Sequence, residues 1–292
     1  MNIRDVIHSI RPAQWTKNFF VFAALIFSRK ITDVPLLMRT AAAFAIFCFL
    51  SGALYLVNDV LDFKEDRLHP NKSRRPIAAG RVGRPPAIAL AVVFAVASLG
   101  CAYVLNTGFF AAAAVYFSLQ IAYSLKLKHV VILDVFLVAS GFVIRVVAGG
   151  LVIDVPLSSW LLICTTLLAL FIALSKRRHE LVLLEENAAS HRPILKEYNA
   201  YLLDQMISVV TASTVIAYCL YTISEDTIKK FGTSHLIYTT PFVLYGIFRY
   251  LYLVHKKGLG GSPEELILKD KPLAAAIVLW IATAVGILYF FK

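Results

Sequence analysis

Three oxygen-bearing side chains recur at intervals of four residues, directly after an apolar stretch that ends at Val57. They are Asn58, Asp62 and Asp66. On a helix this spacing places all three on one face. Carboxylates near the carboxyl end of a helix oppose its dipole and repel each other. A divalent cation removes both penalties, and such oxygen ligands suit Mg²⁺ held together with a substrate diphosphate. We therefore predict that these three residues bind Mg²⁺ and form the catalytic centre.

Basic residues follow this acidic face, beyond Pro70, which we expect to end the helix. Lys72 and Arg75 could hold the phosphate oxygens that a metal ion leaves uncovered. The alternative for the whole stretch is a solvated loop of mixed charge. Random loops rarely place three oxygen ligands on one face, so we favour the metal and phosphate site.

Lysines recur at the end of a later apolar stretch, where Lys126 and Lys128 follow Tyr123. They could bind a substrate phosphate, or they could only complement the helix dipole and extend to the membrane surface. Lys17 begins the first apolar stretch and could point into the cavity where the substrate binds. All of these residues remain candidates for substrate binding.

Asp134 and Arg145 lie in one apolar stretch, about three helical turns apart, and so share a face. A buried arginine in a membrane normally faces a cavity. We expect Asp134 at the mouth of the cavity and Arg145 deeper, although an ion pair with a neighbouring helix would explain the same pattern.

A third basic group, Lys176-Arg177-Arg178, stands two residues before Glu180. It is typical of an anion clamp, or of the ordinary positive charge of a cytoplasmic loop. The candidate substrate-binding residues are Lys17, Asp59, Lys72, Arg75, Tyr123, Lys126, Lys128, Asp134, Arg145, Lys176, Arg177, Arg178, Glu180 and Tyr198.

The composition indicates the elements that must position these residues. The 292 residues are 59% hydrophobic and 16% charged, with a mean hydropathy of +0.73. This is typical of a polytopic membrane protein, so we expect an all-α bundle forming one integral-membrane domain over residues 1–292. Length and hydropathy predict nine spans. They are Asn18–Ile31, Thr40–Leu61, Pro86–Leu105, Phe109–Leu125, Val130–Val152, Ser158–Ser175, Met206–Ile223, His235–Val254 and Leu273–Phe291.

The positive charges predict an orientation with the N-terminus in the cytoplasm and the C-terminus outside. That arrangement places 22 of the 29 Lys and Arg residues inside and six outside. The large polar loops 62–86, 175–205 and 255–272 then lie on the cytoplasmic side of a prokaryotic plasma (inner) membrane. Topology and anion binding account for the net charge of +11, so we expect no nucleic acid partner.

The acidic block resembles the signature of the UbiA superfamily of intramembrane prenyltransferases. That signature is Asn-x-x-x-Asp-x-x-x-Asp followed by Arg-Pro, here Asn58, Asp62, Asp66, Arg75 and Pro76. The resemblance implies a nine-span helical fold with cytoplasmic catalytic loops along nearly the whole chain.

One departure from that pattern narrows the resemblance. Prenyl-transferring members carry a second Asp-x-x-x-Asp motif where this chain has Lys176-Arg177-Arg178. The chain is more similar to the branch of decaprenyl-phosphate phosphoribosyltransferases of arabinan precursor synthesis. This similarity implies Mg²⁺-dependent transfer of 5-phosphoribose from phosphoribosyl diphosphate to a polyprenyl phosphate. The alternatives are a prenyltransferase acting on an aromatic or other acceptor, and a membrane transporter or lipid-binding protein. A homo-oligomer is possible in each case.

Overall fold

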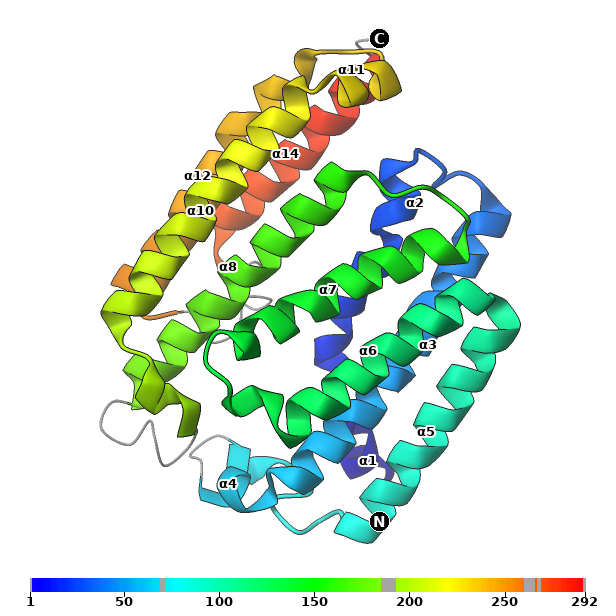
Figure 1. The fold of residues 1–292 in the computed structure, drawn as a ribbon, viewed down its shortest axis with the longest axis vertical. Helices are drawn as coiled ribbons and strands as arrows, with labels where there is room; N and C mark the ends of the chain where they lie inside the picture. Colours follow the sequence, from blue (N-terminus) through cyan, green and yellow to red (C-terminus); the bar gives the residue numbers. More distant parts are fainter. Residues whose placement is uncertain (1, 69–71, 185–192, 260–265, 267–268, 291–292) are drawn as a thin grey trace. The chain divides into compact units, whose positions relative to one another are not determined.

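The computed structural model describes residues 2–68, 72–184, 193–259, 266 and 269–290 (Figure 1). Every regular element within these ranges is a helix, which confirms the all-α prediction. Pro70, expected to end the helix that carries the acidic face, lies outside the described residues, as do parts of the predicted loops 175–205 and 255–272.

Seven helices of the described chain are long and apolar enough to cross a membrane. Each corresponds to a span predicted from hydropathy. They are α3 (Val34–Leu61), α5 (Arg84–Leu105), α6 (Thr107–Leu125), α7 (Leu133–Val152), α8 (Ser159–Leu184), α10 (Ala200–Ile223) and α14 (Lys271–Phe290). The predicted count of nine is therefore not confirmed.

The other two predicted spans have a different local structure. Instead of a span over Asn18–Ile31, the chain forms a 3₁₀ helix, η1 (Pro12–Phe22), and the short α2 (Ala23–Phe27). Instead of one over His235–Val254, it forms η6 (His235–Thr239) and α12 (Thr240–Lys256), whose α-helical part has only 17 residues. Both segments are apolar, and hydropathy does not distinguish a 3₁₀ helix from an α-helix.

A break in the helix occurs at the acidic face. The α-helix α3 ends at Leu61, Asp62 is its C-cap, and a new short helix, α4, spans Phe63–Leu68. The hydrogen bonds continue across the break, because the Asp62 amide donates to the Asn58 carbonyl at 2.9 Å and the Asp66 amide to the Asp62 carbonyl at 2.8 Å. The four-residue spacing of the polar side chains is therefore preserved.

The chain divides into two compact units. The first comprises Met1–Ser158 with Glu186–Glu197. In it α3 packs against α5 and η1, and α6 packs against α7 (Figure 1). The core of this unit contains Phe47, whose ring centroid lies 5.7 Å from that of Phe109 and 5.3 Å from that of Tyr116. The short helices α1 (Ile3–Ser9), η2 (Lys72–Arg74), η3 (Leu127–His129) and η5 (Pro193–Glu197) complete the unit.

The second unit comprises Ser159–Glu185 with Tyr198–Lys292. Within it α8 packs against α10 and α12 packs against α14, and the short α11 (Glu225–Phe231) follows α10. The predicted sixth span ended at Ser175, but α8 continues to Leu184. Residues 176–180 are therefore helical rather than part of a loop. Their charges lowered the local hydropathy, which is why the sequence placed the end of the helix too early.

Candidate active site

Asn58 and Asp62 contact each other, as their spacing predicts. The Asn58 Nδ2 donates to Asp62 Oδ2 at 3.0 Å, and Ser124 at the end of α6 donates to Asn58 Oδ1 at 3.3 Å. The Lys128 ammonium, in η3, forms an ion pair with the other carboxylate oxygen of Asp62. The ends of α3 and α6 thus bring an amide, a carboxylate and a lysine together.

A second pair of carboxylates lies against two arginines. Arg75 Nη1 donates to Asp66 Oδ2 at 2.5 Å and to Asp59 Oδ1 at 3.1 Å. Arg11 forms a further ion pair with Asp59. Burial raises the pKa of the Asp66 carboxyl above its ordinary value, while Arg75 and Lys72 oppose that shift. Nearby cations are therefore what favours the ionised form of this buried carboxylate.

Arg11 owes its position to an unusual backbone conformation. It lies between α1 and Pro12 with a φ of 52°, in the left-handed region that residues other than glycine seldom adopt. Its guanidinium carbon lies 4.9 Å from the centroid of the Tyr55 ring. Burial lowers the pKa of Arg11, and Asp59 opposes that shift. The ion pair and the ring contact are interactions that can hold a locally unfavourable conformation in place.

The donor set of the first unit fits Mg²⁺. Asn58, Asp59, Asp62 and Asp66 supply hard oxygen atoms, and Asp59 Oδ2 is buried with no hydrogen-bond partner in the described chain. Among the residues that the structure describes, no group of three or more His, Cys, Asp or Glu side chains forms a complete metal site. Mg²⁺ is commonly bound through one or two carboxylates, substrate phosphates and water, so a complete protein cage is not required.

The remaining candidates of the first unit occupy different surroundings. The charge of Lys72 opposes the rise that burial causes in the pKa of Asp66. Lys126 is exposed at the C-cap of α6, and Tyr123 is half-buried in its last turn. The Lys17 ammonium contacts the side-chain oxygen of Gln14 within η1. Their roles in substrate binding stay predictions.

Arg145 is held by partners within the protein. Its Nε donates to Asn18 at 2.8 Å, one Nη to the Gly141 carbonyl at 2.7 Å, and the other Nη to the Tyr116 hydroxyl at 2.7 Å. Its side chain also lies over the Tyr116 ring, 4.6 Å from the centroid. Asp134, expected at the mouth of a cavity, is fully buried in the first turn of α7. Whether either residue contacts a substrate stays a prediction.

The basic group in the second unit is tied to carboxylates of that unit. Arg177 is buried and donates to Glu180 at 2.6 Å, one helical turn further along α8. Arg178 donates to both carboxylate oxygens of Asp204 on α10, at 2.5 and 3.3 Å. The arrangement orients two guanidinium groups at the end of α8.

Two other predicted residues of this unit differ in exposure. Lys176 is exposed on α8, whereas Tyr198 is buried. The prediction that Lys176, Arg177 and Arg178 bind a donor phosphate stays open, as do the predicted roles of Glu180 and Tyr198.

Sequence reasoning missed several residues that the structure brings to these groups. Arg11 and Ser124 contact Asp59 and Asn58 from 48 and 66 positions away in the chain, a separation at which no local pattern signals a contact. In the second unit, His255 Nε2 lies 3.1 Å from the Asp204 carboxylate, 51 positions away. Arg11 stands immediately before Pro12, seven residues ahead of the first predicted span at Asn18, so its position gave no signal of a contact with Asp59.

A multi-pass helical membrane protein with carboxylates and cations gathered where spans end is typical of a membrane transferase that handles diphosphate substrates. Comparison with known sequences agrees with that class. Residues 18–261 match the UbiA prenyltransferase family, and the chain belongs to this family. It is therefore an enzyme, a transferase embedded in the membrane by several spans.

Two curated relatives are similar over nearly their whole length. The decaprenyl-phosphate phosphoribosyltransferase of Mycolicibacterium smegmatis is 36% identical, over 99% of this chain and 93% of the relative. The protein of the same name from Corynebacterium glutamicum is 35% identical, over 99% and 88% respectively.

Solved structures confirm the fold. A UbiA homolog from Archaeoglobus fulgidus, bound to DMAPP and Mg²⁺, matches with a TM-score of 0.74 at 19% identity, over 98% of this chain and 100% of that chain. A digeranylgeranylglyceryl phosphate synthase matches with a TM-score of 0.61 at 18% identity, over 98% and 95% respectively.

Proposed function

We propose that this enzyme transfers 5-phosphoribose from phosphoribosyl diphosphate to a polyprenyl phosphate such as decaprenyl phosphate, and releases diphosphate. The observation that carries the proposal is the basic group Lys176-Arg177-Arg178. It stands where the resemblance to the UbiA family implies a second aspartate motif in prenyl-transferring members. A donor with a diphosphate and a 5-phosphate needs more cations and fewer carboxylates than an allylic diphosphate does. The names of the similar curated relatives support the same reaction.

The first unit supplies the groups for the leaving diphosphate. Asp62 and Asp66, with Asn58, would hold Mg²⁺, which supplies positive charge to the diphosphate as it departs. Lys128 and Arg75 already contact these two carboxylates. In this proposal the two cations would donate to phosphate oxygens bound beside the same carboxylates.

The proposed reaction requires little proton transfer by the protein. The bond between the anomeric carbon and the diphosphate oxygen breaks, and a bond from that carbon to an oxygen of the lipid phosphate forms. The lipid phosphate is already ionised at neutral pH, so it attacks without a strong general base. The protein instead binds and orients two anions and stabilises the leaving group, which is where electrostatic preorganisation has its largest effect.

The proposal includes one integral-membrane domain over residues 1–292, in a bacterial plasma membrane, with the N-terminus and the site in the cytoplasm. A water-soluble phosphorylated donor is then reached from the cytosol. Single cysteines at Glu225 and at Lys257, both exposed, test this orientation in intact cells. A membrane-impermeant maleimide should label the first directly and the second only after permeabilisation. The reverse pattern would reject the orientation.

The reaction itself is tested by membranes containing the enzyme, Mg²⁺, polyprenyl phosphate and radiolabelled phosphoribosyl diphosphate. We expect label in the lipid fraction, and no label when EDTA is present. A parallel reaction contains an allylic diphosphate and an aromatic acceptor, because a solved structure of the same fold binds DMAPP. Prenylated acceptor without labelled phosphoribosyl lipid would replace the proposal with the prenyltransferase alternative.

A further inference from the structure

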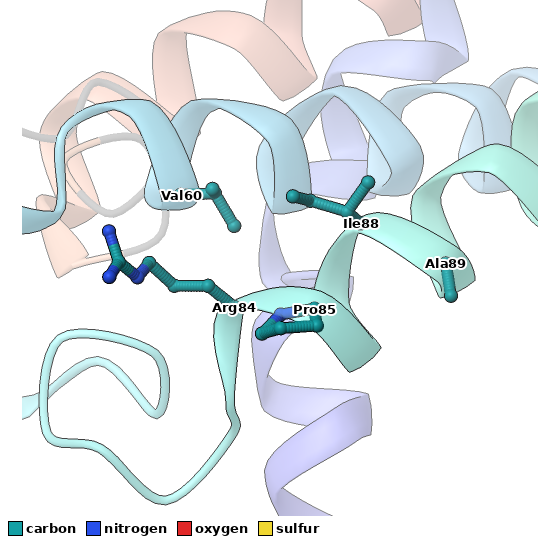
Figure 2. Close-up of a pocket in the computed structure, with 5 residues that line it drawn as sticks. All are labelled: Val60, Arg84, Pro85, Ile88 and Ala89. Carbon is teal, nitrogen blue, oxygen red and sulfur yellow. The ribbon is translucent and has the colours of Figure 1, made fainter.

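A shallow apolar groove of about 520 Å³ lies on the first unit, where the end of α3 meets the beginning of α5. Figure 2 shows Val60 on one side of the groove and Pro85, Ile88 and Ala89 along the first turns of α5 on the other. The side chain of Arg84 extends at one end of this apolar lining. The groove is therefore apolar along its length and basic at one end.

A second arginine contacts the same aromatic ring as Arg84. The guanidinium carbon of Arg84 lies 5.1 Å from the centroid of the Phe63 ring, and that of Arg67 lies 5.5 Å from the same centroid. In the described part of the chain neither arginine forms an ion pair with a carboxylate. Glu65 is two positions before Arg67 on α4, and residues at that spacing do not face each other on a helix. Two cations that contact one ring and have no carboxylate partner among the described residues favour the binding of an anion.

The groove opens onto an apolar face of α5. Ile88, Val92 and Val96 follow at intervals of four residues and so lie on one side of the helix. They are 48%, 56% and 67% exposed, although α5 is apolar enough to be a membrane span. In a bilayer this face contacts acyl chains. Thus the apolar groove continues into a lipid-facing surface, and its basic end lies where the span begins.

We propose that this groove is a binding site for one anionic phospholipid of the bilayer. Arg67 and Arg84 would hold the phosphate of the head group with their forked donors. One acyl chain would follow Val60, Ile88 and Val92. Basic pockets between membrane helices at the polar end of the span bind anionic head groups in this way.

The position of the site argues for a bilayer phospholipid rather than the acceptor substrate. The acceptor phosphate must reach the carboxylate cluster, where Asp59 and Asp66 are buried. Arg84 forms no ion pair with either of them, and the groove residues Pro85 and Ile88 face outward. A lipid phosphate between Arg67 and Arg84 would instead tie α4, which carries Asp66, to the start of α5. The lipid then acts by steadying this short helix.

The test uses the full-length protein, purified in detergent and titrated with phosphatidylglycerol or with phosphatidylcholine of the same acyl chains. Native mass spectrometry counts the bound lipids. We expect one tightly bound phosphatidylglycerol, with affinity lowered roughly fivefold for each arginine replaced in Arg67→Gln and Arg84→Gln. Arg39→Gln is the matched control, because Arg39 is exposed near the opposite end of α3 and has no ion pair among the described residues. The affinity of the Arg39→Gln variant for phosphatidylglycerol should equal that of the wild type.

Phe63→Leu tests the geometry without changing the charge. It removes the ring that both guanidinium groups contact, so the affinity for phosphatidylglycerol should fall while the fold, checked by circular dichroism, is retained. If the variant that combines Arg67→Gln with Arg84→Gln does not fold, the single Arg84→Gln variant and Phe63→Leu give the answer.

Three results would overturn the proposal. The first is unchanged phosphatidylglycerol binding in the folded arginine and Phe63 variants. The second is equal affinity for phosphatidylcholine. The third is stoichiometric displacement of the phospholipid by added polyprenyl phosphate, which would make the groove part of the acceptor site. Since the readout is binding, the test is independent of which group the enzyme transfers.

Discussion

Replacing Asp59 by asparagine should destabilise the first unit more than it alters catalysis. The Asp59 side chain is 2% exposed and accepts from two arginines, Arg11 and Arg75, whose side chains are 22% and 23% exposed. Asparagine keeps the size of the side chain and can keep the oxygen that both arginines contact, but it removes the negative charge that neutralises them. Its amide NH₂ would take the place of Oδ2, which is buried without a hydrogen-bond partner in the described chain. Removing one partner of a fully buried ion pair is destabilising by about 3–5 kcal/mol.

The expected magnitude for Asp59→Asn is smaller, because both arginines keep some contact with solvent. We expect a loss of about 2–3 kcal/mol, which for a domain of this size corresponds to a fall in Tm of roughly 5–10 °C. The assay is thermal unfolding in lipid nanodiscs, monitored by circular dichroism, beside Asp62→Asn. The Asp62 side chain is 25% exposed, so its variant should unfold within about 2 °C of the wild type.

The opposite result has a definite meaning. If Asp59→Asn melts with the wild type but has a raised KM for phosphoribosyl diphosphate, Asp59 binds the substrate, as the sequence predicted, and is not primarily a partner of the arginines. Adding Arg11→Gln separates the two explanations further. It removes one unneutralised cation, so under the stability account it should recover part of the Tm lost in Asp59→Asn.

Three further variants test other parts of the structure. Asp62→Asn should lower turnover by about 10²-fold or more, as when a main electrostatic stabiliser is removed; near wild-type turnover at saturating Mg²⁺ would show that Asp62 is not a metal ligand. Arg178→Gln should raise the KM for phosphoribosyl diphosphate roughly tenfold, because one charge-assisted hydrogen bond is lost. Lys229→Gln, which removes one partner of an exposed surface ion pair, is the control and should leave this KM unchanged. An equal KM in both variants would mean that Lys176, Arg177 and Arg178 only orient the chain in the membrane. Gly149→Ala should destabilise the protein by about 3 kcal/mol or more, because the added Cβ would lie 2.0 Å from the Val21 carbonyl oxygen. Gly100→Ala is the control and should be tolerated, because its Cβ would meet nothing within 4 Å. Similar melting temperatures for the two alanine variants would contradict the close packing of η1 on α7.

Membrane spans were predictable where apolarity, length and α-helical structure coincide. The predicted Pro86–Leu105 and the observed Arg84–Leu105 differ by only two residues at one end. The prediction of Asn18–Ile31 was less successful because the choice of a 3₁₀ helix depends on tertiary contacts. Gly149 allows the backbone of α7 to approach Val21, and Asn18 accepts from Arg145, 127 positions away. Neither contact leaves a periodic signal in the sequence.

The same distinction applies to the candidate site. The contact of Asn58 with Asp62 follows from a local spacing and could be predicted. The cations that neutralise the carboxylates come from distant segments, so residue type indicated them but no pattern paired them. The surroundings of Arg177 could not be predicted from residue type either. Its charge suggested a loop, whereas it is buried within a helix and hydrogen-bonded to Glu180.

Asp59, Asp62 and Asp66 differ in exposure, and that difference separates structural from chemical roles. Asp62 is the most accessible and contacts a lysine, which is a flexible and strongly hydrated partner. Asp59 is enclosed between two arginines. Asp66 is equally buried but shares its only arginine in the described chain with Asp59. Arg75 therefore joins the structural carboxylate to a proposed metal ligand. Both contacts are made by one nitrogen, Nη1, so Arg75 brings a single positive charge to two carboxylates at once. The Arg-Pro dipeptide of the signature thus has a physical reason: the arginine fixes Asp66 relative to the buried end of α3, and only then can Asp62 and Asp66 act on the same diphosphate.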